Sequence, residues 1–173
     1  MMANFIKAED FHKKFDALSD LPISRLFACA LLVMAGLFPQ ATAAEAARER
    51  VAYEVVDLTI PASLTGKPGD PVKGRALAIQ RKKGNCLACH GMPIPEEDDH
   101  GTTGPDLTHV ASRLGIPALR IRLVDPKRVN PATMMPAFYR VDGLHRVAKK
   151  FQGKSILTAR EVEDVVAYLA TLK

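Results

Sequence analysis

Two cysteines and a histidine stand together near the middle of the chain, where residues 86–90 read CLACH. Two thiols separated by two residues can each add across one of the two vinyl groups on neighbouring edges of a porphyrin ring, provided that the chain turns like a helix between them. The next residue, His90, then points its imidazole toward the iron. This CxxCH pattern is typical of c-type haem attachment. We therefore expect one covalent haem c, held by thioethers from Cys86 and Cys89.

Two other interpretations of this motif lack the residues or the setting that they need. A structural zinc site requires a second pair of cysteine or histidine ligands nearby, and the only further cysteine, Cys29, lies inside a distant apolar stretch. A thioredoxin-like redox pair belongs in a βαβ setting, whereas the residues that flank the motif are not strand-like. Haem attachment remains the preferred interpretation.

A haem iron with one histidine needs a sixth ligand or an open face, and this choice separates electron transfer from ligand chemistry. Met92 is too close to the motif to reach the opposite face of the ring. Residues 130–138, NPATMMPAF, are the better candidate because their two prolines favour an extended loop. Neighbouring side chains of an extended chain point in opposite directions, so only one of Met134 and Met135 can face the iron. The competing interpretation of either methionine is core packing.

The N-terminal part of the chain predicts export. Residues 26–38 read LFACALLVMAGLF, and they follow Arg25 and precede small residues at Ala41 and Ala43. A basic residue, a short apolar core and a small-x-small site make up a secretory signal, and a bilayer span would need about 20 residues. We expect cleavage after Ala43 and a periplasmic mature chain without a membrane span. An uncleaved membrane anchor is the alternative, because the leader before Arg25 is long.

One helix is expected to deliver the haem motif. Asp70 and Pro71 form an N-cap followed by proline at the first helical position, and the helix should end at Gly84. Gly74 and Ala78 are small enough to let another helix cross closely. The residues that repeat at helical spacing along this helix, and define its packing face, are Val72, Ala76, Ile79 and Lys83.

A second amphipathic helix is expected at the C-terminus. Thr158 and Glu161 match a capping box, and Leu157 and Val162 match a hydrophobic staple. One apolar stripe follows, on Val162, Val165, Val166, Leu169 and Leu172. Shorter helices are expected at residues 108–114 and 117–124, and no strand pattern is present, so the fold class is all-α.

Composition and charge exclude several classes of protein. The 173 residues are 47% hydrophobic and 25% charged, which excludes a disordered or collagen-like chain. The net charge is +5, yet the basic residues are scattered and their densest run is residues 81–83. We therefore expect no nucleic-acid partner. The acidic residues 96–99 are expected to form a solvated loop rather than a metal site.

Several stretches resemble known families. The CxxCH motif, the GPDL of residues 104–107 and the later Met-Pro loop resemble class I cytochrome c. More specifically, GNCLACHGMP at 84–93, DPKRVNPATMMP at 125–136 and ILTAREVEDVVAYL at 156–169 resemble SoxX, the small subunit family of the thiosulfate-oxidising SoxAX cytochromes. The resemblance implies three to five helices around one covalently attached haem, with residues 70–173 as the cytochrome c domain.

The resemblance also implies a ligand set. His90 would be the proximal iron ligand, and Met135, directly before Pro136, the distal one, with Met134 as its rival. The carbonyl of Pro105 would accept the Nδ1 proton of His90 and fix the plane of the imidazole.

The family's activity implies a role and partners for this chain. In SoxAX, thiosulfate is joined oxidatively to a cysteine of a SoxYZ carrier protein, and two electrons leave through haem. Residues 44–173 would hold no free thiol once Cys86 and Cys89 are thioethers, so the catalytic cysteine is expected on a SoxA-like partner. This chain would be the electron-transfer subunit of an S-thiosulfotransferase and would pass electrons to a soluble cytochrome. The alternatives are a stand-alone electron shuttle and a five-coordinate haem protein that binds small ligands or peroxide.

The expected organisation is therefore a signal peptide with a long leader at residues 1–43, an N-terminal arm at 44–69 and the haem domain. Lys82 and Lys83 are expected near an exposed haem edge as a weak docking face for an electron-transfer partner. Arg113 and Arg120 are candidates for binding the haem propionates.

Overall fold

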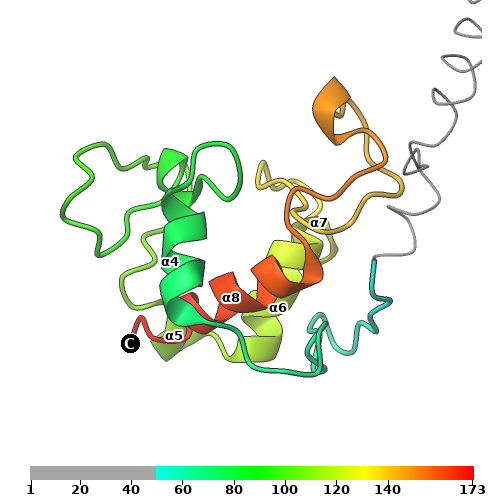
Figure 1. The fold of residues 1–173 in the computed structure, drawn as a ribbon, viewed down its shortest axis with the longest axis horizontal. Coiled ribbons are helices and arrows are strands. Elements are labelled where there is room, and N and C mark those ends of the chain that lie inside the picture. Colours follow the sequence, from blue (N-terminus) through cyan, green and yellow to red (C-terminus); the bar gives the residue numbers. More distant parts are fainter. Residues whose placement is uncertain (1–49) are drawn as a thin grey trace, which may run out of the picture. The chain divides into compact units, whose positions relative to one another are not determined.

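The computed structural model describes residues 50–173. The chain divides into two units, residues 1–40 and 41–173, and only the second contains described residues. The predicted signal peptide and the start of the predicted arm lie outside the described part. The helices are α4 (Pro71–Ile79), α5 (Val110–Arg113), α6 (Ile116–Val124), α7 (Pro126–Val129) and α8 (Ala159–Leu169), with 3-10 turns η2 (Cys86–Ala88) and η3 (Lys149–Phe151) (Figure 1).

The all-α prediction is confirmed over residues 50–173. These residues contain no strand, and β pairing is limited to an isolated bridge between Val56 and Thr59. No helix among them is long and apolar enough to cross a membrane. The short helices expected within residues 108–124 are present as α5 and α6.

Helix α4 begins as predicted and ends earlier than predicted. The Asp70 carboxylate accepts hydrogen bonds from the first-turn N–H groups of Val72 and Lys73, at 3.0 and 3.3 Å. The helix stops at Ile79, because the carbonyl of Gln80 then accepts from two later N–H groups, at 3.0 and 3.2 Å, and closes a turn. This turn redirects the chain into the cysteine motif before the predicted end of the helix.

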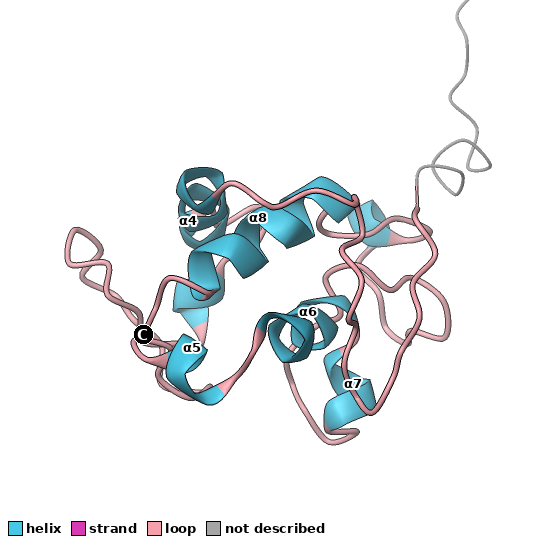
Figure 2. Cartoon of the chain, turned by 90° about the horizontal axis from the view of Figure 1, so that it is seen from below, coloured by secondary structure: helices cyan, strands magenta, loops and turns pink. Residues whose placement is uncertain are grey.

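The packing face predicted for α4 is wrong at Val72 and Ala76, whereas Ile79 packs against the core and the predicted close crossing is confirmed. Val72 is 77% exposed and Ala76 is exposed, whereas Gly74 and Ala78 are buried. A Cβ added to Gly74 would lie 1.9 Å from the carbonyl oxygen of Asp164 in α8. The two helices therefore touch along their backbones, and Figure 2 shows them side by side. A contact this close requires the smallest residues of α4 at the crossing, while Leu77 and Ile79 pack against the core beside it.

The N-terminus of α8 is capped as predicted. The Glu161 N–H donates to Thr158 Oγ1 at 3.2 Å, and the Thr158 N–H donates to Glu161 Oε2 at 2.8 Å. Leu157 and Val162, the predicted staple, are both buried. The predicted apolar stripe is also buried, which confirms Val162, Val165, Val166, Leu169 and Leu172 as core residues.

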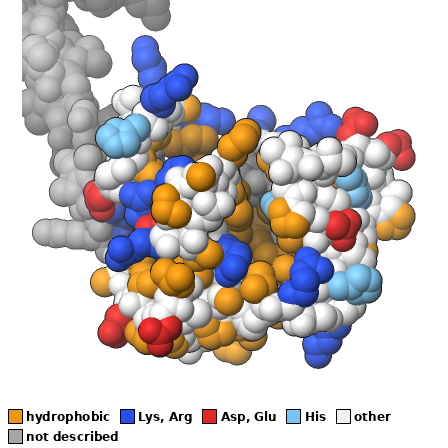
Figure 3. Space-filling view, turned by 180° about the vertical axis from the view of Figure 1, so that it is seen from behind, with side chains coloured by type: hydrophobic (Ala, Val, Ile, Leu, Met, Phe, Trp, Pro, Cys, Tyr) orange, Lys and Arg blue, Asp and Glu red, His pale blue; other side chains and the backbone are white. Residues whose placement is uncertain are grey.

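A hollow opens on the face opposite to that of Figure 1. Figure 3 shows hydrophobic side chains along this hollow, with Lys and Arg side chains around it. The core also keeps a set of hydrophobic side chains that are only half-buried, which include Leu77, Cys86, Leu107, Leu114, Val129, Met135 and Ile156. These side chains leave part of the apolar surface of the core accessible to solvent.

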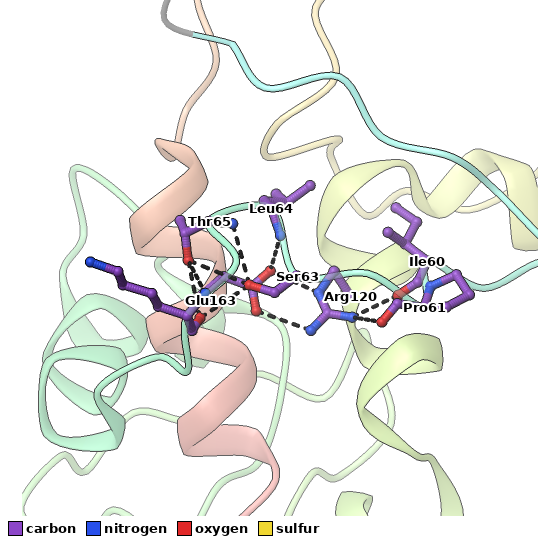
Figure 4. Close-up of polar contacts among 8 residues, drawn as sticks. Ile60, Pro61, Ser63, Leu64, Thr65, Arg120 and Glu163 are labelled. Atoms are coloured by element: carbon purple, nitrogen blue, oxygen red, sulfur yellow. Dashed lines mark hydrogen bonds and ion pairs between the residues drawn. The ribbon is translucent and has the colours of Figure 1, made fainter.

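The described part of the N-terminal arm is fastened to the helical core by a buried ion pair (Figure 4). Arg120 and Glu163 are 4% and 3% exposed, and their guanidinium and carboxylate meet at 2.7 and 3.0 Å. Arg120 Nη1 also donates to the carbonyls of Ile60 and Pro61, at 2.6 and 3.2 Å, and Glu163 Oε1 accepts from the Leu64 N–H at 2.9 Å.

This arrangement corrects one prediction. Arg120 is buried with its donors directed at Glu163 and at the arm, so it is a structural residue and not a partner for haem propionates. Ile60 and Leu64 are buried as well, so this stretch belongs to the core although its sequence has no regular pattern.

Candidate haem site

The cysteine motif forms the tight turn that its chemistry requires. Residues Cys86–Ala88 make the 3-10 turn η2, and the Cys86 carbonyl accepts from the N–H groups of Cys89 and His90, at 3.1 and 2.9 Å. Asn85 enters the turn with a left-handed φ of 48°, a conformation that asparagine adopts more readily than most residues. Both thiols are free, with Cys86 half-buried and Cys89 exposed. Burial raises the pKa of the Cys86 thiol to about 11, so before haem attachment it stays protonated at neutral pH.

The imidazole of His90 is oriented through its Nδ1 atom. Nδ1 lies 2.6 Å from the carbonyl oxygen of Pro105, and because a carbonyl can only accept, Nδ1 carries the proton. The Nε2 atom is then the unprotonated nitrogen, with the lone pair that a metal requires. A hydrogen bond of this kind fixes the ring plane and raises the basicity of the other nitrogen.

The loop that supplies this carbonyl approaches the imidazole very closely. A Cβ added to Gly104 would lie 2.3 Å from His90 Cε1, so the approach requires glycine. The loop is also tied to the motif by two backbone bonds, from Gly104 N–H to the Cys89 carbonyl at 2.7 Å and from Leu107 N–H to the Gly91 carbonyl at 2.9 Å. His90 is therefore held by its own turn and by a loop that follows it.

The two methionines of the second loop lie in different surroundings. Met134 is 84% exposed, whereas Met135 is half-buried and packs against the core. The segment that connects α7 to the two methionines, residues 130–133, forms a hydrogen-bonded turn. It is not the fully extended segment expected from its prolines. The Thr133 N–H donates to the Asn130 carbonyl at 3.1 Å, and the Met135 N–H donates to Thr133 Oγ1 at 3.2 Å.

The chain after this loop is fixed to the end of α6. The N–H groups of Phe138 and Arg140 donate to the carbonyls of Leu123 and Val124, at 2.9 and 3.1 Å. Arg140 also forms an ion pair with the buried Asp125, with Nε 3.0 Å from Oδ1. The methionine loop thus starts and ends on one rigid corner of the fold.

Two basic residues singled out in the sequence, Lys83 and Arg113, have other contacts. Lys83 Nζ is paired with both oxygens of Glu161, at 2.8 and 3.0 Å, so only Lys82 of the expected docking pair is exposed and unpaired among the described residues. Arg113 Nη2 donates to the Asp106 carbonyl at 2.8 Å. The acidic loop is tied back to α4 by an ion pair between Glu96 and Arg75.

The residues present fit a covalently attached haem. Two free thiols lie on one turn, and the adjacent imidazole presents Nε2. The same domain also has an apolar hollow (Figure 3) and a half-buried methionine, Met135. Cys86 and Cys89 would hold the group through thioethers. Haem supplies a one-electron couple between ferric and ferrous iron.

Comparison with known proteins agrees with this fit. Residues 71–173 match the family model described as cytochrome c. No curated protein matches the sequence. Among solved structures, the chain is similar to one in the crystal structure of SoxXA from P. pantotrophus, with 39% identity and a TM-score of 0.65, over 70% of this chain and 94% of that chain.

The chain belongs to the cytochrome c family, and it is an electron-transfer protein with covalently bound haem c. The length and identity of the structural match narrow this class further. Within the family the protein is a SoxX-like class I cytochrome.

Proposed function

We propose that this protein is the electron-accepting subunit of a periplasmic SoxAX-type S-thiosulfotransferase. It takes up electrons released when thiosulfate is joined to a cysteine of a SoxYZ-like carrier, and it passes them to a soluble cytochrome. The single observation that carries the proposal is the 39% identity to a SoxXA chain over 94% of that chain's length. A SoxA-like subunit is the proposed partner.

The number of free cysteines supports the assignment of electron transfer to this chain and of the reactive cysteine to its partner. The carrier thiolate and thiosulfate form a new S–S bond, and the product is a cysteine S-thiosulfonate with the loss of two electrons. Among the described residues the only cysteines are Cys86 and Cys89, and thioether formation consumes both. The nucleophilic or sulfur-carrying cysteine is therefore assigned to the partner. This chain, with one haem, receives the two electrons one at a time and must discharge the first before it accepts the second.

We assign His90 as the proximal iron ligand and Met135 as the distal one. The Nδ1–H of His90 donates to the Pro105 carbonyl, which leaves Nε2 for the metal. Met135 is favoured over Met134 because a ligand must face the interior, and Met134 is 84% exposed. A thioether ligand stabilises ferrous iron and raises the reduction potential relative to bis-histidine ligation, which suits an electron acceptor.

Residues 1–43 are proposed to be the export signal, residues 44–69 the arm and 70–173 the cytochrome c domain. Thioether attachment after export would place the mature protein in the periplasm. The charge-free residues 26–38 and the small residues before position 44 support this assignment.

The proposal is tested by reduction of the haem in a reconstituted system. The haem-loaded chain, co-purified with a SoxA-like subunit, is mixed with a SoxYZ-like carrier and thiosulfate, and the ferrous haem spectrum is followed. We expect reduction that requires the carrier, thiosulfate and the partner's cysteine. A complex that remains oxidised with every component present would contradict the proposal.

The same preparation separates the alternative functions. A stand-alone electron shuttle would purify without a second haem-bearing chain and would exchange electrons with respiratory partners in its absence. A five-coordinate haem protein would bind carbon monoxide readily in the ferrous state, with no methionine ligand to displace.

A further inference from the structure

We infer that Lys127 is a positioning residue that holds the Met135 loop against the core and so controls how easily an external ligand displaces the methionine. The inference rests on the proposed role of Met135 as the distal ligand. Lys127 lies on α7 (Pro126–Val129), at the corner from which the loop departs (Figure 1).

The ammonium group of Lys127 bonds two carbonyls of the loop. Nζ donates to the Thr133 carbonyl at 2.8 Å and to the Pro131 carbonyl at 3.3 Å. An ammonium carries three donors and no acceptor, and hydrogen bonds from an ionised donor are shorter and stronger than neutral ones. Because the two acceptors are two residues apart, their convergence on one nitrogen requires the loop to curve around the lysine.

Thr133 connects the lysine to the methionine. Its carbonyl accepts from Lys127, while its hydroxyl accepts from the Met135 N–H at 3.2 Å. Asn130 closes the other side of the turn, with its side-chain oxygen 3.0 Å from the Ala132 N–H. The Met135 backbone is therefore held through Thr133, whose N–H is bonded to the Asn130 carbonyl and whose own carbonyl is bonded to the lysine.

The two ends of the loop are held independently of Lys127. Asp125, just before α7, is buried and paired with Arg140, and the Phe138 N–H bonds the Leu123 carbonyl beyond the loop. Loss of the lysine amine should therefore release the middle of the loop while the ends stay in place. We expect a looser methionine in a folded protein rather than an unfolded domain.

The neighbouring residue offers a matched control for charge. Arg128 is exposed on the same short helix, and its side chain makes no hydrogen bond or ion pair with another described residue. The substitutions Lys127→Gln and Arg128→Gln remove the same charge from adjacent positions, and only the first removes the bonds to the loop. The substitution Lys127→Arg keeps the charge and a donor of similar reach.

The test measures imidazole binding to the ferric, haem-loaded chain, together with the thioether-to-iron absorption band and the thermal midpoint. Lys127→Gln is expected to bind imidazole about tenfold more tightly than the parent protein, equivalent to about 1.4 kcal/mol, while Arg128→Gln stays within about twofold. Lys127→Arg should restore most of the parent behaviour. Equal affinities in Lys127→Gln and Arg128→Gln would overturn the inference.

Two further variants keep the outcome decisive. Thr133→Val removes the hydroxyl that bonds the Met135 N–H, and it should also tighten imidazole binding; it decides the matter if Lys127→Gln does not load haem. An unchanged affinity in Thr133→Val would then reject the proposed link.

Met135→Ala should abolish the absorption band. If the band survives in Met135→Ala, the ligand assignment fails; if it is lost there and Lys127→Gln behaves like its control, only the role of Lys127 fails.

Discussion

His90 Nδ1 lies 2.6 Å from the carbonyl oxygen of Pro105, and the preceding Gly104 leaves no room for a side chain beside the imidazole. The substitution Gly104→Ala should displace the imidazole or the loop, because the new Cβ would stand 2.3 Å from Cε1. We expect poorer haem loading and, because a weaker Nδ1 hydrogen bond lowers the basicity of Nε2, a higher reduction potential, measured by the haemochrome spectrum and redox titration.

Gly115→Ala is the matched control for this substitution, since the nearest atom to its new Cβ, Pro117 Cδ, is 3.8 Å away. If Gly104→Ala and Gly115→Ala load haem and titrate alike, the close approach to His90 has no functional role.

The two adjacent methionines should respond differently to replacement. Met135→Ala is expected to lower the reduction potential and to open the ferrous protein to carbon monoxide, because the half-buried thioether is lost. Met134→Ala should change neither property, since this side chain is 84% exposed. Carbon monoxide titration and potentiometry check both variants, and the reverse pattern would transfer the ligand role to Met134.

The buried Arg120–Glu163 pair should be a large contributor to stability. Glu163→Gln leaves the guanidinium of Arg120 without a charged partner, and removal of one member of a buried pair costs about 3–5 kcal/mol. Urea denaturation followed by circular dichroism measures the loss. Asp142→Asn, which breaks the exposed pair with Arg50, is the control and should cost about 1 kcal/mol or less. Equal losses in the two variants would reject the role given to the buried pair.

The capping carboxylate of α8 should make stability depend on acid. Burial opposes ionisation of Glu161, but hydrogen bonds from Lys83 and the Thr158 N–H outweigh it and hold its pKa below the usual range. The stabilisation is therefore complete above the unfolded-state pKa, about 4.3, and is lost as pH falls through the lower folded-state pKa.

Glu161→Gln should consequently destabilise the protein at pH 7 and lose most of this effect under strongly acidic conditions. Urea unfolding at the two pH values measures the difference, with the exposed Glu54→Gln as the control. A destabilisation by Glu161→Gln that is the same at both pH values would show that ionisation of this carboxylate is not involved.

The features that the sequence predicted well are those determined by neighbouring residues. Asp70 caps α4 and Thr158 pairs with Glu161 because each cap closes within three residues. The cysteine turn is local in the same way. Because these hydrogen bonds join residues only a few positions apart, a short sequence motif is enough to predict them.

The features that were missed depend on distant contacts. Helical spacing places Val72 and Ala76 on the packing face of α4, but both are exposed, because the close crossing with α8 turns Gly74 and Ala78 inward. Arg120 was assigned to haem, and it bonds Glu163, which is far away in the chain. One signal is present in the sequence: Arg120 and Glu163 carry opposite charges on two of the expected helices. The contacts of Lys127 with its own loop had no comparable signal.

Covalent attachment of haem to Cys86 and Cys89 is tested most directly by whether the haem stays with the polypeptide after denaturation. The full chain is produced in a host that attaches haem in its periplasm, extracted with acidified acetone, separated by denaturing electrophoresis and stained for haem peroxidase activity. We predict a stained band at the mass of the mature chain, and no band for a Cys86→Ala, Cys89→Ala double variant. An unstained band for the parent protein, with the haem found in the acetone, would contradict covalent attachment.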